Sequence, residues 1–245
     1  MNTIKMIKYS FLNSIRGTGI YFGVILIMLH LFSFISMQGE AGGVGGMDCG
    51  LIVFMMILGI ATFRETFHLS LQSGVSRKSM ITGMAISNIL IAISAAVGEL
   101  IVDIIGNFYE KKISGFTYNS IYEQIFFGYH NDGMNASDYL ASFLTGVSVY
   151  IGIIFTGLFI GILFYRLSKV MKFVIPIGIY VLVQLFFIID MVCFQGKAMT
   201  KLVEFMQWVF GESSHLAESF LVLGAVFLVI SFIASRRLAI NDRAA

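Results

Sequence analysis

The sequence predicts an all-α integral membrane protein with six transmembrane helices and with both termini in the cytoplasm. Three observations predict this fold class. Hydrophobic residues make up 58% of the 245 residues and charged residues only 12%, against roughly 25% charged residues in soluble domains. The mean hydropathy is +0.88. Six intervals of the chain are free of Asp, Glu, Lys and Arg, and each is close to the roughly 20 residues that a helix needs to cross a bilayer.

These intervals place the spans at about 17–39, 49–67, 77–105, 139–165, 173–193 and 217–236. The second interval stops at Arg64, and we expect its helix to continue beyond this residue, because the long arginine stem can reach the interface. The chain 1–245 is then a single transmembrane domain.

The basic residues set the predicted orientation, because Lys and Arg in short loops are retained on the cytoplasmic side. With the N-terminus inside, the outer segments hold only Lys111, Lys112, Lys197 and Lys201. The inner segments hold all the others: Lys5, Lys8, Arg16, Arg64, Arg77, Lys78, Arg166, Lys169, Lys172, Arg236, Arg237 and Arg243. An even number of spans is needed to keep this asymmetry.

The N-terminal segment 1–16 is predicted to be an amphipathic helix in the inner membrane interface. Its apolar residues recur at helical spacing beside a basic row, and they are Ile4, Ile7, Phe11 and Ile15. The alternative is a cytoplasmic extension of the first span. Because that span is longer than the roughly 7 to 15 apolar residues of a signal peptide, we expect it to be retained.

Two outer segments are predicted to have structure of their own. The polar and aromatic segment 107–138 is expected to form a small ordered cap. The segment 197–216 carries an apolar stripe beside Lys201 and Glu204, with Trp208 as an interfacial anchor.

Several function classes are not supported by any motif. There is no phosphate-binding loop motif, so we expect no ATP on this chain, and the four histidines are scattered among different segments. We therefore expect no enzymatic activity, no cofactor on this chain and no nucleic-acid partner. Cys49 and Cys193 are interpreted as free thiols, with a disulfide between them as the alternative.

Acidic residues lie inside or at the ends of two spans. Glu99 and Asp103 are one turn apart towards the outer end of the third span, and Asp190 lies at the outer end of the fifth. One interpretation is coupling to protons or cations, because an ionised carboxylate inside the bilayer is costly. The other is that these carboxylates reach the outer water.

The segment 64–78, which joins the second and third spans on the cytoplasmic side, has the clearest local signals. Phe67, His68 and Leu71 can share a short helix, and Gly74 can adopt the left-handed conformation that ends it. Ser76 can cap the next helix. The result is a stiff corner that presents apolar and aromatic side chains to a soluble partner; the alternative is a simple interfacial turn.

This segment resembles the permease subunits of small type-2 ABC exporters, whose loop between spans two and three often reads Leu-x-x-x-Gly-x-Ser-Arg-(Lys/Arg). This chain has Leu71, Gly74, Ser76, Arg77 and Lys78 in that order, with one residue fewer between the Leu and the Gly. The six-span plan with both ends inside is similar as well. The cap at 107–138 is longer than the family's usual connection.

The resemblance implies a transport mechanism with separate subunits. The ATPase-coupling residues would be Phe67, His68, Leu71, Gly74, Ser76, Arg77 and Lys78, with Arg166 and Lys169 in the second inner loop. The substrate path would be lined by Phe54, Met55, Phe186, Phe187 and Asp190. ATP and Mg would be bound by an ATP-binding cassette ATPase, and the second permease would be another copy or a similar chain.

The same resemblance implies a place and a substrate class. The chain would lie among the lipids of a bacterial plasma membrane and export amphipathic or hydrophobic substrates. Exporters of antimicrobial or toxic peptides, including phenol-soluble modulins, are the most similar subclass. Two other classes remain open: an ion-coupled secondary carrier or channel, and a non-transporting immunity or assembly protein.

Overall fold

The computed structural model describes residues 3–39, 42–127, 134–168 and 170–235 of the chain. Six helices in this part are long and apolar enough to cross a membrane: α1 (Thr3–Met37), α2 (Met47–Gln72), α3 (Arg77–Lys112), α5 (Ala136–Arg166), α6 (Met171–Cys193) and α8 (Ser213–Ser235). This confirms the prediction of a helical protein with six helices that could span a membrane. The short α4 (Ile121–Phe126) and the α7 helix (Lys197–Gly211) complete the helices.

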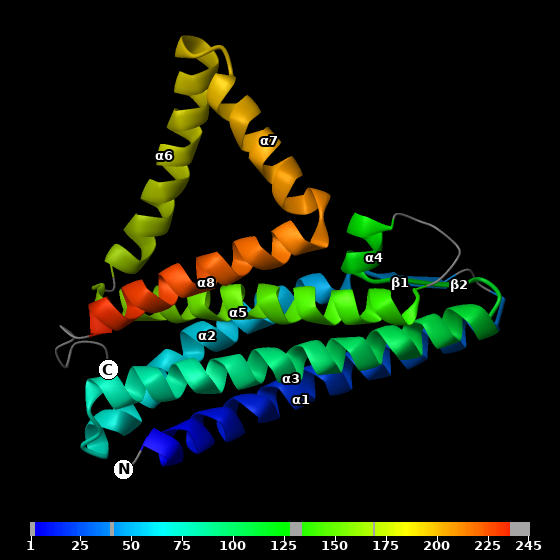
Figure 1. Ribbon diagram of the computed structural model, residues 1–245, viewed down its shortest axis with the longest axis horizontal. Helices are drawn as coiled ribbons and strands as arrows, with labels where there is room; N and C mark the ends of the chain where they lie inside the picture. The colour runs from blue at the N-terminus through cyan, green and yellow to red at the C-terminus, as the bar shows by residue number, and fades with distance from the viewer. Residues whose placement is uncertain (1–2, 40–41, 128–133, 169, 236–245) are drawn as a thin grey trace.

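Five of the long helices form the body of the molecule. Figure 1 shows α1, α2, α3, α5 and α8 lying alongside one another, while α6 and α7 stand away from them as an open hairpin. The beginning of α1, the turn between α2 and α3, and the end of α8 lie at one end, which we call the corner end. The opposite end carries the strands β1 (Gly42–Gly45) and β2 (Phe116–Asn119), and we call it the sheet end.

Helix α5 lies at the centre of the body, packed against α2, α3 and α8. Glycines allow the backbones to approach closely on two of its sides. A Cβ atom on Gly157 would lie against the backbone of α2 at Met56, and the Cα of Gly59 is 3.2 Å from that position. On the other side, a Cβ on Gly224 would lie 3.2 Å from the Cα of Gly152. Close contact between small residues is the usual way in which helices associate in lipid.

Helix α1 is continuous from Thr3 to Met37. The segment 1–16 was predicted to be a separate helix, but its described residues continue directly into the first span. They form the extension of that span that was the alternative prediction. The side chains that α1 buries are Met6, Leu29 and a row of serine and threonine residues, while Ile4 is exposed. Met6 packs against Gly83 of α3, and Phe11 and Ile15 of the predicted apolar stripe pack against the core, so the buried face of α1 adjoins that stripe.

The sheet end contains an ordered structure where the cap 107–138 was predicted, although part of that range lies outside the described residues. Helix α3 runs on to Lys112, and strands β1 and β2 pair in parallel with Gly42 opposite Phe116. The pairing is parallel because α1 and α3 run in the same direction and each is followed by a strand. The glycine-rich run that forms β1 fits here because a Cβ on Gly43 would collide with Thr117.

Helix α6 is the least buried of the six candidate spans. Only 6% of its apolar window is buried in the chain, against 56% for α5. Its first residues lie near the corner end, and α7 returns the chain to the start of α8 (Figure 1). Cys193, the last residue of α6, and Cys49 are both exposed free thiols, as the sequence predicted.

Replacing Gly157 by Ala should separate α2 from α5. The new methyl group would meet backbone atoms, which cannot rotate away, and we expect a loss of about 1–3 kcal/mol in stability. The measurement is thermal unfolding of the purified protein in detergent.

The matched control is Gly23→Ala in α1, where nothing lies within 4 Å of the Cβ position. This change should be neutral or slightly stabilising, because Ala favours the helix. Equal melting temperatures for both variants would contradict the proposed glycine contact.

Candidate functional site

The corner between α2 and α3 has the predicted turn and cap. Gly74 has φ +63°, the left-handed conformation that glycine adopts without strain. The Ser76 side chain accepts a hydrogen bond from the backbone N–H of Ser79 at 3.2 Å, so Ser76 is the N-cap of α3. The corner therefore joins two long helices through only four residues, Ser73 to Ser76, that belong to neither helix.

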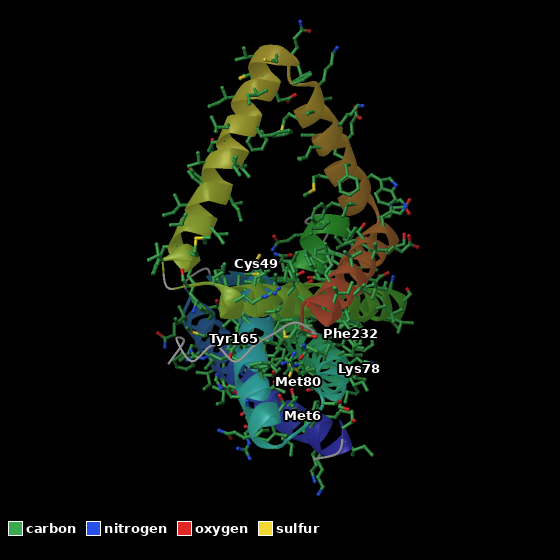
Figure 2. All side chains as sticks on the ribbon, turned by 90° about the vertical axis from the view of Figure 1, so that its left-hand side faces the viewer. Met6, Cys49, Lys78, Met80, Tyr165 and Phe232 are labelled. Atoms are coloured by element: carbon green, nitrogen blue, oxygen red, sulfur yellow. The ribbon has the colours of Figure 1, made fainter. Side chains whose placement is uncertain are left out.

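Phe67 does not have the exposed position that the sequence predicted. Its side chain is 1% exposed, and its ring lies 5.5 Å from that of Phe63 and 4.8 Å from that of Tyr165. The correction has a simple cause: α2 continues as one helix through this segment, and the face carrying Phe67 packs against α5. Figure 2 shows Tyr165 and Met80, which belong to the same buried cluster, within the body.

The other predicted coupling residues at this end are mostly exposed. His68, Gly74, Ser76, Arg77 and Lys78 are exposed on the corner. Arg166, the last residue of α5, is exposed too. Leu71 lies in α2 but its side chain is outside the described part, and Lys169 lies outside the described residues altogether. Their role in binding an ATPase stays a prediction.

The residues predicted to line a substrate path are not brought together within one chain. Met55 is fully buried in the core, and Phe54 stacks on Tyr21 of α1 with ring centroids 4.9 Å apart. Phe186 and Phe187 lie on the exposed surface of α6, which packs mainly against α7. A path between α2 and α6 would therefore need a second chain.

Asp190 has a structural role at the junction of α6 and α7. It is 3% exposed, and its two carboxylate oxygens accept hydrogen bonds from the backbone N–H groups of Ala198 and Met199 at 3.0 and 2.9 Å. These are free N–H groups of the first turn of α7, which favour a negative charge. The carboxylate thus stiffens the hairpin instead of facing the outer water.

A group of acidic side chains gathers at the sheet end from three separate elements. Asp48 comes from the first turn of α2, Glu99 and Asp103 from α3, and Glu123 from α4. Asp48, Asp103 and Glu123 are each at most 9% exposed. We call these four residues the acid group. Asp103 is thus buried and does not reach outer water, contrary to one of the two interpretations of its position.

Hydrogen bonds from the cap hold this acid group in place. The Tyr118 hydroxyl donates to Asp103 Oδ1 at 2.6 Å, and the Ile121 N–H donates to Asp48 Oδ2 at 2.6 Å. Glu123 accepts from Asn107 at 3.3 Å and also closes the capping box of α4. Strand β2 therefore supplies a donor to Asp103, α4 supplies one to Asp48, and α3 supplies Asn107 to Glu123.

The Tyr118 hydroxyl remains a neutral donor. Burial raises the pKa of Tyr118 above its ordinary value, and the negative charge of Asp103 raises this pKa further. Both effects disfavour the phenolate, so the Tyr118 hydroxyl keeps the proton that it donates to Asp103.

A cavity of about 170 Å³ lies beside the acid group. Asp48, Glu99, Ser142, Thr145 and Tyr150 form its polar part, and the Tyr150 hydroxyl is hydrogen-bonded to Glu99. The remaining wall is mainly apolar and comes from five helices: Ile52, Ile121, Tyr122, Ile125, Phe126, Val149, Phe210, Leu216 and Phe220. Concave sites with an apolar wall and a few polar groups are typical of ligand binding.

The sequence revealed only part of this site. Glu99 and Asp103 stood out as acids within an apolar interval, whereas Asp48 and Glu123 were not singled out. Their meeting depends on the parallel pairing of β1 and β2, which brings the start of α2 next to the start of α4. The sequence did contain one signal for Asp48: this acidic residue follows closely after the glycine run 42–46, where a helix begins.

No protein-family model, curated protein or solved structure matches this chain. Function is therefore inferred from the corner and from the acid-lined cavity. These two sites lie at opposite ends of α2 and α3.

Replacing Tyr118 by Phe should destabilise the sheet end. The change removes the donor to Asp103 and leaves both carboxylate oxygens without a partner, since Oδ2 has none among the described residues. We expect a loss of about 1–3 kcal/mol, measured by thermal unfolding in detergent. Tyr122→Phe is the matched control, because no hydrogen bond of the Tyr122 hydroxyl is found among the described residues. If both variants unfold alike, the bond to Asp103 contributes nothing.

Proposed function

We propose that this chain is the membrane-spanning permease subunit of an ATP-driven exporter in a bacterial plasma membrane. The observation that carries the proposal is the corner: two long helices joined by a capped four-residue turn, with His68 and Lys78 exposed beside it. Such a corner can receive force from a soluble protein and pass it to both helices without bending. The basic residues at this end support a cytoplasmic location.

In this proposal the chain itself does not hydrolyse ATP. ATP and Mg would be bound by a separate ATP-binding cassette ATPase that docks on the corner and on Arg166. A second permease, identical or similar, would pack on α6, whose exposed Phe186 and Phe187 would then line a shared path. Apolar, adaptable walls suit amphipathic or hydrophobic substrates such as antimicrobial or toxic peptides.

The acid group favours a second candidate, an ion-coupled carrier or channel. Carboxylates inside a membrane protein often mark ion pathways, and Asp103 is buried with one oxygen unpartnered among the described residues. Transport into proteoliposomes that is driven by an ion gradient, with no ATPase present, would favour this candidate over the exporter. No observation favours an immunity or assembly protein.

The exporter proposal is tested by purifying the tagged chain from its native membrane and measuring ATP hydrolysis by the purified complex. We expect an ATP-binding cassette protein to co-purify. His68→Ala combined with Lys78→Ala should lower the hydrolysis by about tenfold, since both side chains are exposed on the surface that would dock.

Lys112→Ala is the matched control, because Lys112 is exposed at the other end of the same helix. It should leave both co-purification and hydrolysis unchanged. The proposal is wrong if no ATPase accompanies the chain, or if the corner variant hydrolyses ATP as fast as the control.

A further inference from the structure

The cavity at the sheet end combines an acidic floor with an apolar wall. Asp48 and Glu99 reach it from α2 and α3, and Phe126, Phe210 and Phe220 belong to the wall opposite. A volume of about 170 Å³ is larger than one or two ordered water molecules need. The cavity is therefore suited to a small organic group with a polar end and an apolar part.

No basic side chain balances these acids in the described structure. None of the residues that line the cavity is Lys, Arg or His, and the ion pair between His215 and Glu212 lies outside it. Asp103, 1% exposed, lies on α3 one turn beyond Glu99 and keeps Oδ2 without a hydrogen-bond partner among the described residues. Buried carboxylates are normally paired with a positive charge, and the residues that line this cavity supply none.

The composition of the site narrows the class of ligand. An anion would be repelled by Asp48 and Glu99. A metal ion is not favoured, because no three His, Cys, Asp or Glu side chains of the described residues are placed to hold one. An alkylammonium group fits better, since its N–H groups can donate to both carboxylates while its carbon chain lies against the isoleucine and phenylalanine side chains.

We propose that this cavity binds the ammonium end of amphipathic cations. Asp48 and Glu99 are the counter-ions, and the apolar wall contacts the part of the ligand's carbon chain next to the ammonium group. As a statement about what is transported, this inference rests on the proposed exporter function. Binding itself needs no ATPase, so the two proposals fail in separate experiments.

The test is isothermal titration of the full chain in nanodiscs of zwitterionic lipid, with hexylammonium, hexanol and hexanoate at neutral pH. These probes share one hydrocarbon chain and differ in charge, and lipid-only nanodiscs give the partition background. We expect saturable binding of hexylammonium, at least about tenfold tighter than binding of the other two probes. Equally tight binding of hexanol would overturn the inference.

The residues are tested with Glu99→Gln, which should weaken hexylammonium binding by about tenfold or more. Glu218→Gln makes the same change at an exposed position of α8 outside the cavity and should have no effect. Ile125→Trp, at a half-exposed wall position, keeps both carboxylates and should weaken binding by filling space. Unchanged affinity in Glu99→Gln overturns the inference, and if that variant does not fold, unchanged affinity in Ile125→Trp does so.

Discussion

The close contact of helix backbones around α5 is the constraint on which the rest of the structure depends. Apolar side chains gain little by leaving lipid for protein, so helices in a membrane associate through tight packing of small residues. Gly59 and Gly157 join α2 to α5, and Gly152 and Gly224 join α5 to α8. The same approach brings α3 beside α5, where a Cβ on Gly146 would lie 3.0 Å from the Glu99 carboxylate. A glycine thus leaves room for the acid.

The cap at the sheet end and the acid group depend on each other. Asp48 and Asp103 lie in or next to apolar surroundings where α2 and α3 offer them few donors, and the cap supplies the Tyr118 hydroxyl and the Ile121 N–H. In return, Asp48 ties the start of α4 to the start of α2. This gives a physical reason for the long connection after α3.

Local signals in the sequence were sufficient to predict the six long helices and the corner. Contacts between remote segments decided how these elements pack. The six long helices follow from hydropathy, and the corner follows from Gly74 and Ser76, whose turn and cap need no distant contact. The burial of Phe67, the parallel pairing of β1 with β2 and the separation of α6 from the body depend on contacts between remote segments. The cavity depends on all six helices that line it, α2, α3, α4, α5, α7 and α8, so of its lining residues only Glu99 could be noticed beforehand.

The geometry of α2 and α3 relates the two candidate sites. Helix α2 carries Asp48 in its first turn and leads into the corner at its end, and α3 carries the Ser76 cap at its start and Glu99 well along its length. A helix of 36 residues such as α3 is about 54 Å long. Because the corner is short and capped, a displacement there moves both helices together. The exporter proposal requires that the two carboxylates then shift relative to the wall residues on α4, α5, α7 and α8, so that force on the corner would open or close the cavity from the opposite end of the molecule.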